Sequence, residues 1–424
     1  MPSFSIPLSG LTAAQDQLQS VSNNLANLNT DGFKDQTVSF SDLFTQASIT
    51  NGSGDPLQTG SGVQIAATES DFTEGNLNPT GTSSNMAISG NGFFVTKNVS
   101  GLQDFTRAGN FTTNNAGQLV TPNGELLLGY PAVGGVINTT GALQPVQVGS
   151  VTSPAVATTK FQISANLSSD TLVGGVGAPS TFPIYDSLGS SHTLAVSYTK
   201  TGVNAWNYSV TVPSADLSTG GTGTTQVASG SFSFNSSGQM VLAGTPPATT
   251  IAITVPPTTT PAATFADGAA PMSLTWDLTD LAGNTTITQT ASASATNTTT
   301  QDGYASGTLT NYTVQQDGTV QGTFSSGKTL PLGQVAVASF ANVQGLSHTG
   351  NTNFQATAAS GAAVIGQAGT GGRGTIVGDS VEQSNVDIAK EFARLIVAQQ
   401  AYSANAKSIT TFNQVSQATI AMIQ

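Results

Sequence analysis

The stretch SIPLSGLTAAQDQLQSVSNNLANLNTDGFK occupies residues 5–34 and carries the clearest periodic pattern near the N-terminus. Its apolar residues recur at alternating spacings of three and four, which places them on one side of an α-helix. They are Leu11, Ala14, Leu18, Val21, Leu25 and Leu28. The pattern follows Pro7 and ends at the turn signal of residues 29–32. The sequence therefore predicts an amphipathic N-terminal helix about 30 Å long.

A second helical pattern lies at the other end of the chain. Its apolar residues are Ile388, Phe392, Leu395, Ala398, Tyr402, Ala406, Ile409, Phe412 and Val415. Residues 381–424 contain no Pro or Gly, and Asp379 or Ser380 precedes them as a possible cap. We expect a helix from about Val381 towards Gln424, about 65 Å long.

Between these ends the sequence is typical of β structure. Short alternating runs, such as 194–198, 231–234 and 335–340, are separated by glycine-rich turns. Many short strands without a helical pattern indicate barrels or sandwiches. Residues 241–300 are rich in Thr, Ala and Pro, which fits either strand edges and loops or a mobile linker.

The predicted fold class is α+β, with several domains. A long helix with one narrow apolar stripe needs a partner, and the nearest candidate for each terminal helix is the other one. Coiled-coil-like pairing of the ends would make the architecture discontinuous, with mainly β domains inserted. The expected parts are a helical domain of residues 1–30 and 379–424, an extended β linker of 31–71, an inner β domain of 72–145 and 303–378, and an outer β domain of 146–302.

Two arrangements of the helices stay open on pattern alone. Both helices could pack on the β core as amphipathic surface helices. Alternatively, a two-helix pair would leave apolar surface exposed, which neighbouring copies could cover. A repeated contact of that kind that does not close gives a helical polymer.

Composition excludes several classes of function. The chain has 10 basic and 22 acidic side chains, a net charge of −12, so binding to nucleic acid or to an anionic membrane surface is not expected. There are no cysteines and only two histidines, which excludes disulfides, thiolate zinc sites and histidine-rich metal sites. The first residues lack the charge and apolar run of a cleaved signal peptide. No cofactor is expected, and export would use another route.

Several motifs in the sequence are candidates for catalytic or binding sites. Residues 322–329 match the nucleotide-binding pattern GxxxxGKT, but no helix is predicted after them, so a hairpin turn is expected. The glycine-rich run 366–374 is interpreted as a hinge leading into the terminal helix. His192 lies near Asp186 and Ser187 without a nucleophile elbow, and we expect a structural histidine. No catalytic or metal site is predicted.

The asparagines Asn23, Asn24 and Asn27 are unusual within a helix, where their propensity is poor. They could reflect fraying towards the turn at residues 31–32. Their amides could instead form hydrogen bonds with neighbouring subunits.

Both ends of the chain resemble the flagellar rod and hook protein family. The resemblance rests on SGL at 9–11, SNNLAN at 22–27, NTDGFK at 29–34, NMAISGNGFFV at 85–95, FTRAGNF at 105–111 and EQSNVD at 382–387. In the middle, YDSLG at 185–189 with His192, GQVA at 333–336 and FAN at 340–342 are similar to the hook branch. Residues 241–300 match nothing in the family pattern.

The resemblance implies a structural subunit of the bacterial flagellar hook. Such a subunit would be exported by the flagellar type III apparatus without a cleaved signal peptide. It would polymerise outside the cell into a curved tube, a universal joint that transmits motor torque from rod to filament. The implied partners are other copies and the distal rod, hook cap and hook–filament junction proteins. The alternatives are a secreted β-rich adhesin or surface-layer subunit and a distal rod protein.

The expected assembly interface lies on the two terminal helices. Its residues are Leu11, Leu18, Val21, Asn23, Asn24, Leu25, Asn27, Leu28, Ile388, Phe392, Leu395, Tyr402, Asn405, Ile409 and Phe412.

Overall fold

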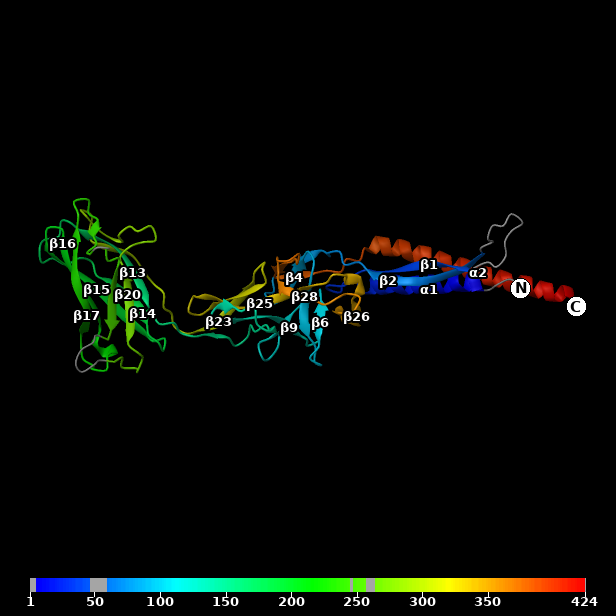
Figure 1. The fold of residues 1–424 in the computed structure, drawn as a ribbon, viewed down its shortest axis with the longest axis horizontal. Coiled ribbons are helices and arrows are strands. Elements are labelled where there is room, and N and C mark those ends of the chain that lie inside the picture. The colour runs from blue at the N-terminus through cyan, green and yellow to red at the C-terminus, as the bar shows by residue number, and fades with distance from the viewer. Residues whose placement is uncertain (1–4, 46–58, 245–246, 257–263, 424) are drawn as a thin grey trace. The chain divides into compact units, whose positions relative to one another are not determined.

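The computed structural model describes residues 5–45, 59–244, 247–256 and 264–423. The chain is mostly β, with one long helix near each end (Figure 1). It divides into two compact units. Unit 1 comprises residues 1–150, 311–322 and 329–424, and unit 2 comprises residues 151–310 and 323–328. The expectation of several β domains between two terminal helices is confirmed.

The N-terminal helix α1 spans Ser5–Ala26. Pro7 lies in its first turn, where a missing backbone N–H costs no helical hydrogen bond. The chain then turns at Gly32, whose φ of +69° favours glycine. A Cβ at this position would lie 2.4 Å from the backbone nitrogen of Ala108, so the turn packs directly on the β domain of unit 1.

The C-terminal helix α2 spans Ile388–Ile423, and the predicted start at Val381 is wrong. Val381 belongs to strand β30 (Ser380–Glu382), which pairs with β3 (Leu77–Pro79). The N-cap is Asp387, whose Oδ1 accepts hydrogen bonds from the backbone N–H groups of Ala389 at 2.8 Å and Lys390 at 3.2 Å. The helix therefore has 36 residues and is about 54 Å long.

Residues 36–45 and 59–70 form a two-stranded ribbon beside α1. Strands β1 (Gln36–Thr45) and β2 (Thr59–Ser70) pair antiparallel, with Gln36 opposite Ser70. Two helix hydroxyls attach the ribbon to α1. Ser20 Oγ donates to the Gln36 carbonyl at 2.8 Å, and Ser9 Oγ accepts from the Val63 N–H at 3.2 Å.

The β domain of unit 1 is built on a sheet with strand order β25-β9-β5-β6-β27-β26. Its strands are β25 (Thr329–Ser339), β9 (Leu126–Val133), β5 (Phe93–Lys97), β6 (Gln103–Thr106), β27 (Asn353–Gln355) and β26 (Ser347–Gly350). Both faces are buried, because Phe93 and Val95 join one apolar cluster while Phe94 joins another. This alternation follows from the two-residue period of a strand.

Short strands complete unit 1. They are β4 (Met86–Ser89), β7 (Thr112–Thr113), β8 (Leu119–Val120), β10 (Val136–Ile137), β11 (Gln144–Pro145), β28 (Val364–Gln367) and β29 (Thr375–Gly378). A single 3₁₀ turn, η2, spans Val343–Gly345. Strands β23 (Gly307–Val314) and β24 (Thr319–Phe324) each run along the chain from one unit into the other.

Unit 2 contains two five-stranded sheets around one apolar core. One sheet has the order β14-β15-β16-β17-β18, and the other joins β19, β20, β13 and β21, with β22 also pairing with β13. Both tryptophans of the chain, Trp206 and Trp276, are fully buried in this core. The elements are β12 (Thr152–Ser153), β13 (Lys160–Ser168), β14 (Ser180–Tyr185), β15 (Ser191–Gly202), β16 (Ala205–Pro213), η1 (Ser214–Asp216), β17 (Thr224–Phe234), β18 (Met240–Val241), β19 (Thr250–Val255), β20 (Met272–Asp277), β21 (Ile287–Thr290) and β22 (Ala295–Gln301).

The low-complexity stretch 241–300 is part of this core. Ile253 on β19 and Leu274 on β20 are buried and alternate with exposed neighbours. The stretch therefore supplies core strands, and the linker interpretation is wrong for its described part. Residues 245–246 and 257–263 lie outside the described residues.

A buried carboxylate in unit 1 gives a test of stability against pH. Burial raises the pKa of Glu125, and the nearby Asp104 carboxylate adds to the rise. Because its pKa is raised in the folded state, the contribution of Glu125 to the stability of unit 1 is most favourable at acid pH. This contribution falls as the pH rises through that pKa. We expect Glu125→Gln to raise the free energy of unfolding at pH 7 by on the order of 0.5 kcal/mol, because the substitution removes the charge. The amide oxygen can still accept from Asn353, and the amide nitrogen can donate to the Thr96 hydroxyl in place of accepting from it.

Urea unfolding of unit 1 at pH 7 and pH 4 measures the effect. The gain should vanish at the lower pH, where Glu125 itself is protonated. A variant less stable than the parent at both pH values would contradict the assignment.

Candidate functional site

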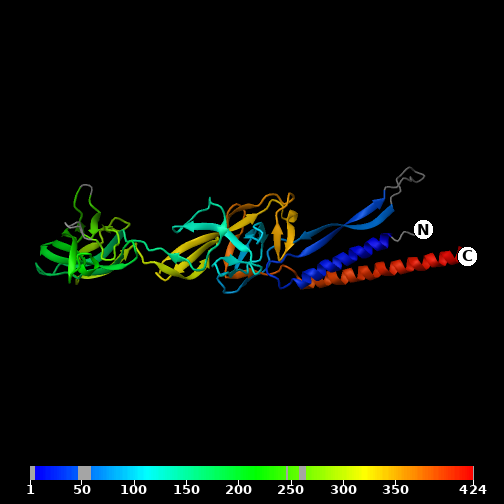
Figure 2. The same ribbon diagram turned by 90° about the horizontal axis from the view of Figure 1, so that it is seen from below.

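The two terminal helices lie side by side in unit 1 (Figure 2). A Cβ at Gly10 of α1 would lie 2.9 Å from the side chain of Asn405 on α2. Near the other end of α1, Asn24 Nδ2 donates to Glu391 Oε2 at 3.1 Å. The two contacts are fourteen residues apart on each helix (24 − 10 and 405 − 391) and run in opposite directions. The helices are therefore antiparallel and in register over four turns.

Small and polar residues form the contact between the helices. Ala14 and Val21 are 4% and 2% exposed, and Ala398 of α2 is fully buried midway between Glu391 and Asn405. Small side chains allow the helix backbones to approach closely, which explains the position of Gly10. Of the predicted stripe on α1, Ala14 and Val21 are buried, whereas its leucines are partly exposed.

The structure separates the fifteen predicted interface residues by exposure. Buried within the chain are Val21 and Asn24. Partly exposed are Leu11, Leu18, Leu25, Asn27, Leu28, Leu395, Asn405, Ile409 and Phe412. Exposed are Asn23, Ile388, Phe392 and Tyr402.

Asn24 forms its hydrogen bonds within the chain. Its side chain is fully buried, and its amide nitrogen lies within hydrogen-bond distance of three acceptors, on Asp35, the Gln36 carbonyl and Glu391. Its amide oxygen accepts from the Gln36 N–H at 3.1 Å. Asn24 therefore contributes to the fold of the single chain, and the prediction of bonds to neighbouring subunits stays a prediction. Asn27 is bonded to Asn23 one turn earlier.

Large apolar side chains remain exposed on α2. Their exposed fractions run from 39% at Tyr402 to 80% at Met422. They are Ile388, Phe392, Ile396, Val397, Tyr402, Val415, Ile420 and Met422, which lie at several positions around the helix. We call them the exposed apolar residues of α2. The last turns of α2 also extend beyond the described part of α1 (Figure 2). An exposed apolar surface of this kind indicates an interaction site.

Charged residues join the helix pair to the β domain. Arg394 of α2 lies 3.2 Å from Asp35 and also pairs with Glu391. Asn385 Oδ1 accepts from the Asp35 N–H at 2.8 Å. Asp35 and Glu391 are 5% and 1% exposed, so both charges depend on these partners.

A second buried cluster centres on Glu382. Its Oε1 lies 2.6 Å from Lys34 Nζ, and its Oε2 lies 3.2 Å from a nitrogen of Arg107. Burial lowers the pKa of Lys34, and Glu382 opposes that effect. Glu382 Oε1 also accepts from the Gly75 N–H at 2.9 Å. We call these two clusters the junction, because they connect the end of α1 and the start of α2 to the β domain.

Sequence reasoning did not single out the junction residues. Glu382 and Lys34 occur only as letters of the family pattern, and Glu391 and Arg394 do not belong to the apolar pattern of the C-terminal helix. Two of their ion pairs, Lys34–Glu382 and Asp35–Arg394, join residues more than 340 positions apart in the chain. The sequence feature that could have drawn attention to them is the rarity of charged residues, because only 32 of 424 residues carry a charge.

The nucleotide-binding motif is a hairpin turn, as expected. Within unit 2, the Phe324 N–H donates to the Lys328 carbonyl at 2.9 Å, and the chain continues as strand β25. Lys328 Nζ lies 5.4 Å from the centre of the Tyr304 ring. No helix N-terminus follows that could bind a phosphate.

The hinge interpretation of residues 366–374 is wrong. This run connects β28 and β29, and β30 still separates it from α2. Arg373 holds the loop by donating to the Gln367 carbonyl at 2.9 Å and to Thr370 Oγ1 at 2.8 Å. The glycines therefore serve a tight turn within the β domain.

His192 is buried in unit 2, and its Nε2 lies 3.0 Å from Asp186 Oδ2. The Ser187 hydroxyl accepts from the Ala270 N–H at 3.2 Å, which places it in a turn contact. Neither described helix is apolar over a length sufficient to cross a bilayer.

Four family models match the chain in order. Residues 6–34 match the flagella basal body rod protein, and residues 87–166 match the flagellar hook protein FlgE/F/G D1 domain. Residues 176–304 match the flagellar basal body protein FlaE D2 domain. Residues 378–422 match the flagellar basal body rod FlgEFG protein C-terminal.

Relatives match over nearly the full length. The flagellar hook protein FlgE of Escherichia coli K12 is 34% identical, with 97% of this chain and 98% of that protein covered. The FlgE of Treponema pallidum is 33% identical, with 95% and 96% covered. The crystal structure of Helicobacter pylori hook protein FlgE2 shares the fold at a TM-score of 0.50 and 16% identity, covering 72% of this chain and 100% of that one.

Full-length similarity to hook proteins does not favour the adhesin, surface-layer or distal rod alternatives. The matched regions include both helical ends and β regions of unit 1 and of unit 2. The chain therefore belongs to the flagellar hook protein FlgE family and is a structural subunit of the bacterial flagellar hook.

Proposed function

We propose that copies of this chain assemble through their terminal helices into the tube of the hook. The α1–α2 pairs, coiled-coil-like in their packing, form the inner part of the tube, and the β units form its outer layers. The tube is curved and acts as a universal joint that passes motor torque from rod to filament. The chain has no catalytic role in this assembly.

The exposed apolar residues of α2 carry this proposal. Phe392, beside Glu391 at one end of the helical pair, is 51% exposed. Burying a large apolar side chain contributes about 1.5–3 kcal/mol, so burial of these eight side chains favours association strongly. Neighbouring copies present the same residues, and repeated contacts that do not close give a helical polymer.

The interface on α1 is a separate row. Val21 and Asn24 hold the helix pair together within the chain, whereas Leu11, Leu18 and Leu25 lie at successive intervals of seven residues and remain partly exposed. We assign these leucines to contacts with neighbouring copies. The inner β domain of 72–145 and 303–378 and the outer one of 146–302 follow outward from the helices.

Export and partners follow from the same assignment. A chain without cysteine forms no disulfides and is easily kept unfolded for the type III apparatus. Few charges allow many copies to pack with little mutual repulsion. The partners are the distal rod, the hook cap and the hook–filament junction proteins, and the polymer lies outside the cell.

Assembly of the purified chain tests the proposal. Leu18→Asp should prevent tube formation, because the added carboxylate must lose its water on burial. Electron microscopy and sedimentation measure assembly, and circular dichroism checks that the β units keep their fold. Leu18→Met, which conserves volume, is the matched control and should assemble normally. Normal tubes from Leu18→Asp would contradict the role of the α1 row.

A further inference from the structure

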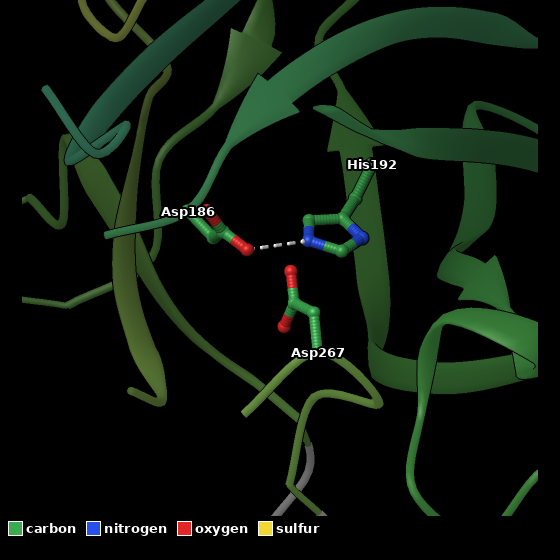
Figure 3. Close-up of side chains that lie close together, drawn as sticks. All are labelled: Asp186, His192 and Asp267. Atoms are coloured by element: carbon green, nitrogen blue, oxygen red, sulfur yellow. Dashed lines mark hydrogen bonds and ion pairs between the residues drawn. The ribbon is translucent and has the colours of Figure 1, made fainter. Parts of the chain in front are cut away.

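Unit 2 contains a compact group of metal-ligating side chains (Figure 3). Asp186 follows β14, His192 lies on β15, and Asp267 lies in the segment before β20. One ligand atom from each residue lies within 4.8 Å of the others. Asp186 is fully buried, His192 is 6% exposed, and Asp267 is exposed. The group therefore has a buried base and one side open to solvent.

The Asp186 carboxylate is held in a fixed orientation. Its Oδ1 accepts from the N–H groups of Leu188 and Ser190, both at 2.9 Å. Its Oδ2 lies 3.0 Å from His192 Nε2. Two ligands bound to a tetrahedral ion at about 2.1 Å are themselves about 3.4 Å apart. An ion could therefore bind these two atoms after they separate by about 0.4 Å, which requires only a small movement of the side chains.

The histidine ring is oriented from its other edge. Its Nδ1 lies 3.1 Å from Asp216 Oδ2, at ion-pair distance, and the ring stacks on Phe265 with 4.5 Å between centroids. Metal-binding histidines commonly direct the second ring nitrogen at a carboxylate, which leaves the first nitrogen free for the metal. Asp216 lies at this edge of the ring, at ion-pair distance but outside hydrogen-bond geometry, so the buried Nδ1 needs only a small adjustment of Asp216 to gain this partner.

The charges around the ring do not balance. Asp186, Asp216 and Asp267 surround one imidazole, and no lysine or arginine forms an ion pair with them among the described residues. A cation would offset this negative charge. Calcium and magnesium prefer oxygen ligands alone, whereas an imidazole with carboxylates suits zinc and related transition metals.

We propose that Asp186, His192 and Asp267 bind a divalent transition-metal cation of the zinc class, with Asp216 orienting the imidazole. Asp267 Oδ1 accepts from the Ala269 N–H at 3.0 Å, so this residue can present its other oxygen to the ion. The site connects three segments of unit 2 that are up to 81 residues apart (267 − 186). Bound metal would stabilise unit 2 without any catalytic role.

The histidine spectrum of the full-length chain tests binding directly. Only His192 and His348 contribute, and His348, which bonds to Ser70 Oγ in unit 1, is an internal reference. With ¹⁵N-labelled histidine, Zn²⁺ should shift the His192 ring signals to saturation at one equivalent and leave His348 unchanged. Mn²⁺ should broaden only His192. An imidazolium with both ring nitrogens protonated at pH 7, unaffected by either metal, would overturn the proposal.

A matched pair of variants assigns the site. Asp267→Asn keeps an acceptor for the Ala269 N–H but removes the charge, and it should weaken Zn²⁺ binding at least about 10-fold. Asp170→Asn changes another exposed aspartate of unit 2 and should leave binding unchanged. Tryptophan fluorescence, which reports only unit 2, should show that Zn²⁺ raises the unfolding temperature of the parent and Asp170→Asn. Equal Zn²⁺ affinity in all three proteins would place the metal elsewhere and overturn the assignment.

Discussion

Substitution of Glu382 by alanine is expected to lower the free energy of unfolding of unit 1 by about 3–5 kcal/mol. Glu382 is fully buried and is the carboxylate partner of both Lys34 and Arg107. Its removal leaves two cations in the interior without a counter-charge, and the Gly75 N–H without its acceptor. This loss of stability is large because the desolvation cost of the cations is no longer offset.

The two units can be followed separately in one experiment. Both tryptophans lie in unit 2 and both helices lie in unit 1. In Glu382→Ala, the helical circular dichroism signal should disappear at lower urea concentration while the tryptophan transition stays unchanged. Glu69→Ala, which removes an exposed carboxylate of β2, should shift neither signal by more than about 0.5 kcal/mol. Equal unfolding of Glu382→Ala and the parent would contradict a structural role for the junction.

Phe392→Asp is expected to abolish assembly while the isolated chain keeps its stability. Phe392 is half exposed in the single chain, so its replacement costs the monomer little. In a tube the same position would be covered by other copies. Loss of its apolar burial, together with burial of a carboxylate, should cost about 3 kcal/mol per subunit and raise the critical concentration for assembly about 100-fold.

Sedimentation at a series of protein concentrations gives the critical concentration, and urea unfolding gives the monomer's stability. Phe392→Leu keeps an apolar side chain of similar length and should assemble within about 10-fold of the parent. If Phe392→Asp assembled like Phe392→Leu, the exposed apolar residues of α2 would have no role in the polymer.

Helical periodicity was sufficient to predict both terminal helices but not the contact between them. The three-four spacing follows from the geometry of one helix, and a helix is present at each end of the chain. The contact between two helices also depends on how closely the backbones approach. Gly10 lies against Asn405 of the partner helix, and Ala14 and Ala398 are buried, whereas the larger Phe392 is half exposed.

The start of α2 illustrates a different difficulty. Residues 381–387 contain no helix-breaking Pro or Gly, and two earlier residues could have served as caps. The chain forms β30 there because β3, about 300 residues earlier, supplies a pairing edge. Asp387 then caps the helix. A local pattern could not choose between these caps, because the choice depends on a long-range strand pairing.

The β units were predictable in kind but not in detail. Alternation in runs such as 194–198 indicated strands, and the structure places that run in β15 with its odd and even residues on opposite faces. The junction was not predictable, since a charge in a sequence is usually solvated. Lys34 and Glu382 meet only because α1, the β domain and β30 converge at one place.

Hydrogen exchange of the helices in the monomer and in the assembled tube tests the central claim most directly. We infer that the helix pair is incomplete until other copies cover the exposed apolar residues of α2. We therefore expect amides of α2 after Asn405 to exchange rapidly in the dilute monomer and to become strongly protected in the tube, while the exchange rates of amides in unit 2 stay the same. Full protection of both helices in the dilute monomer, with no gain on assembly, would contradict the account.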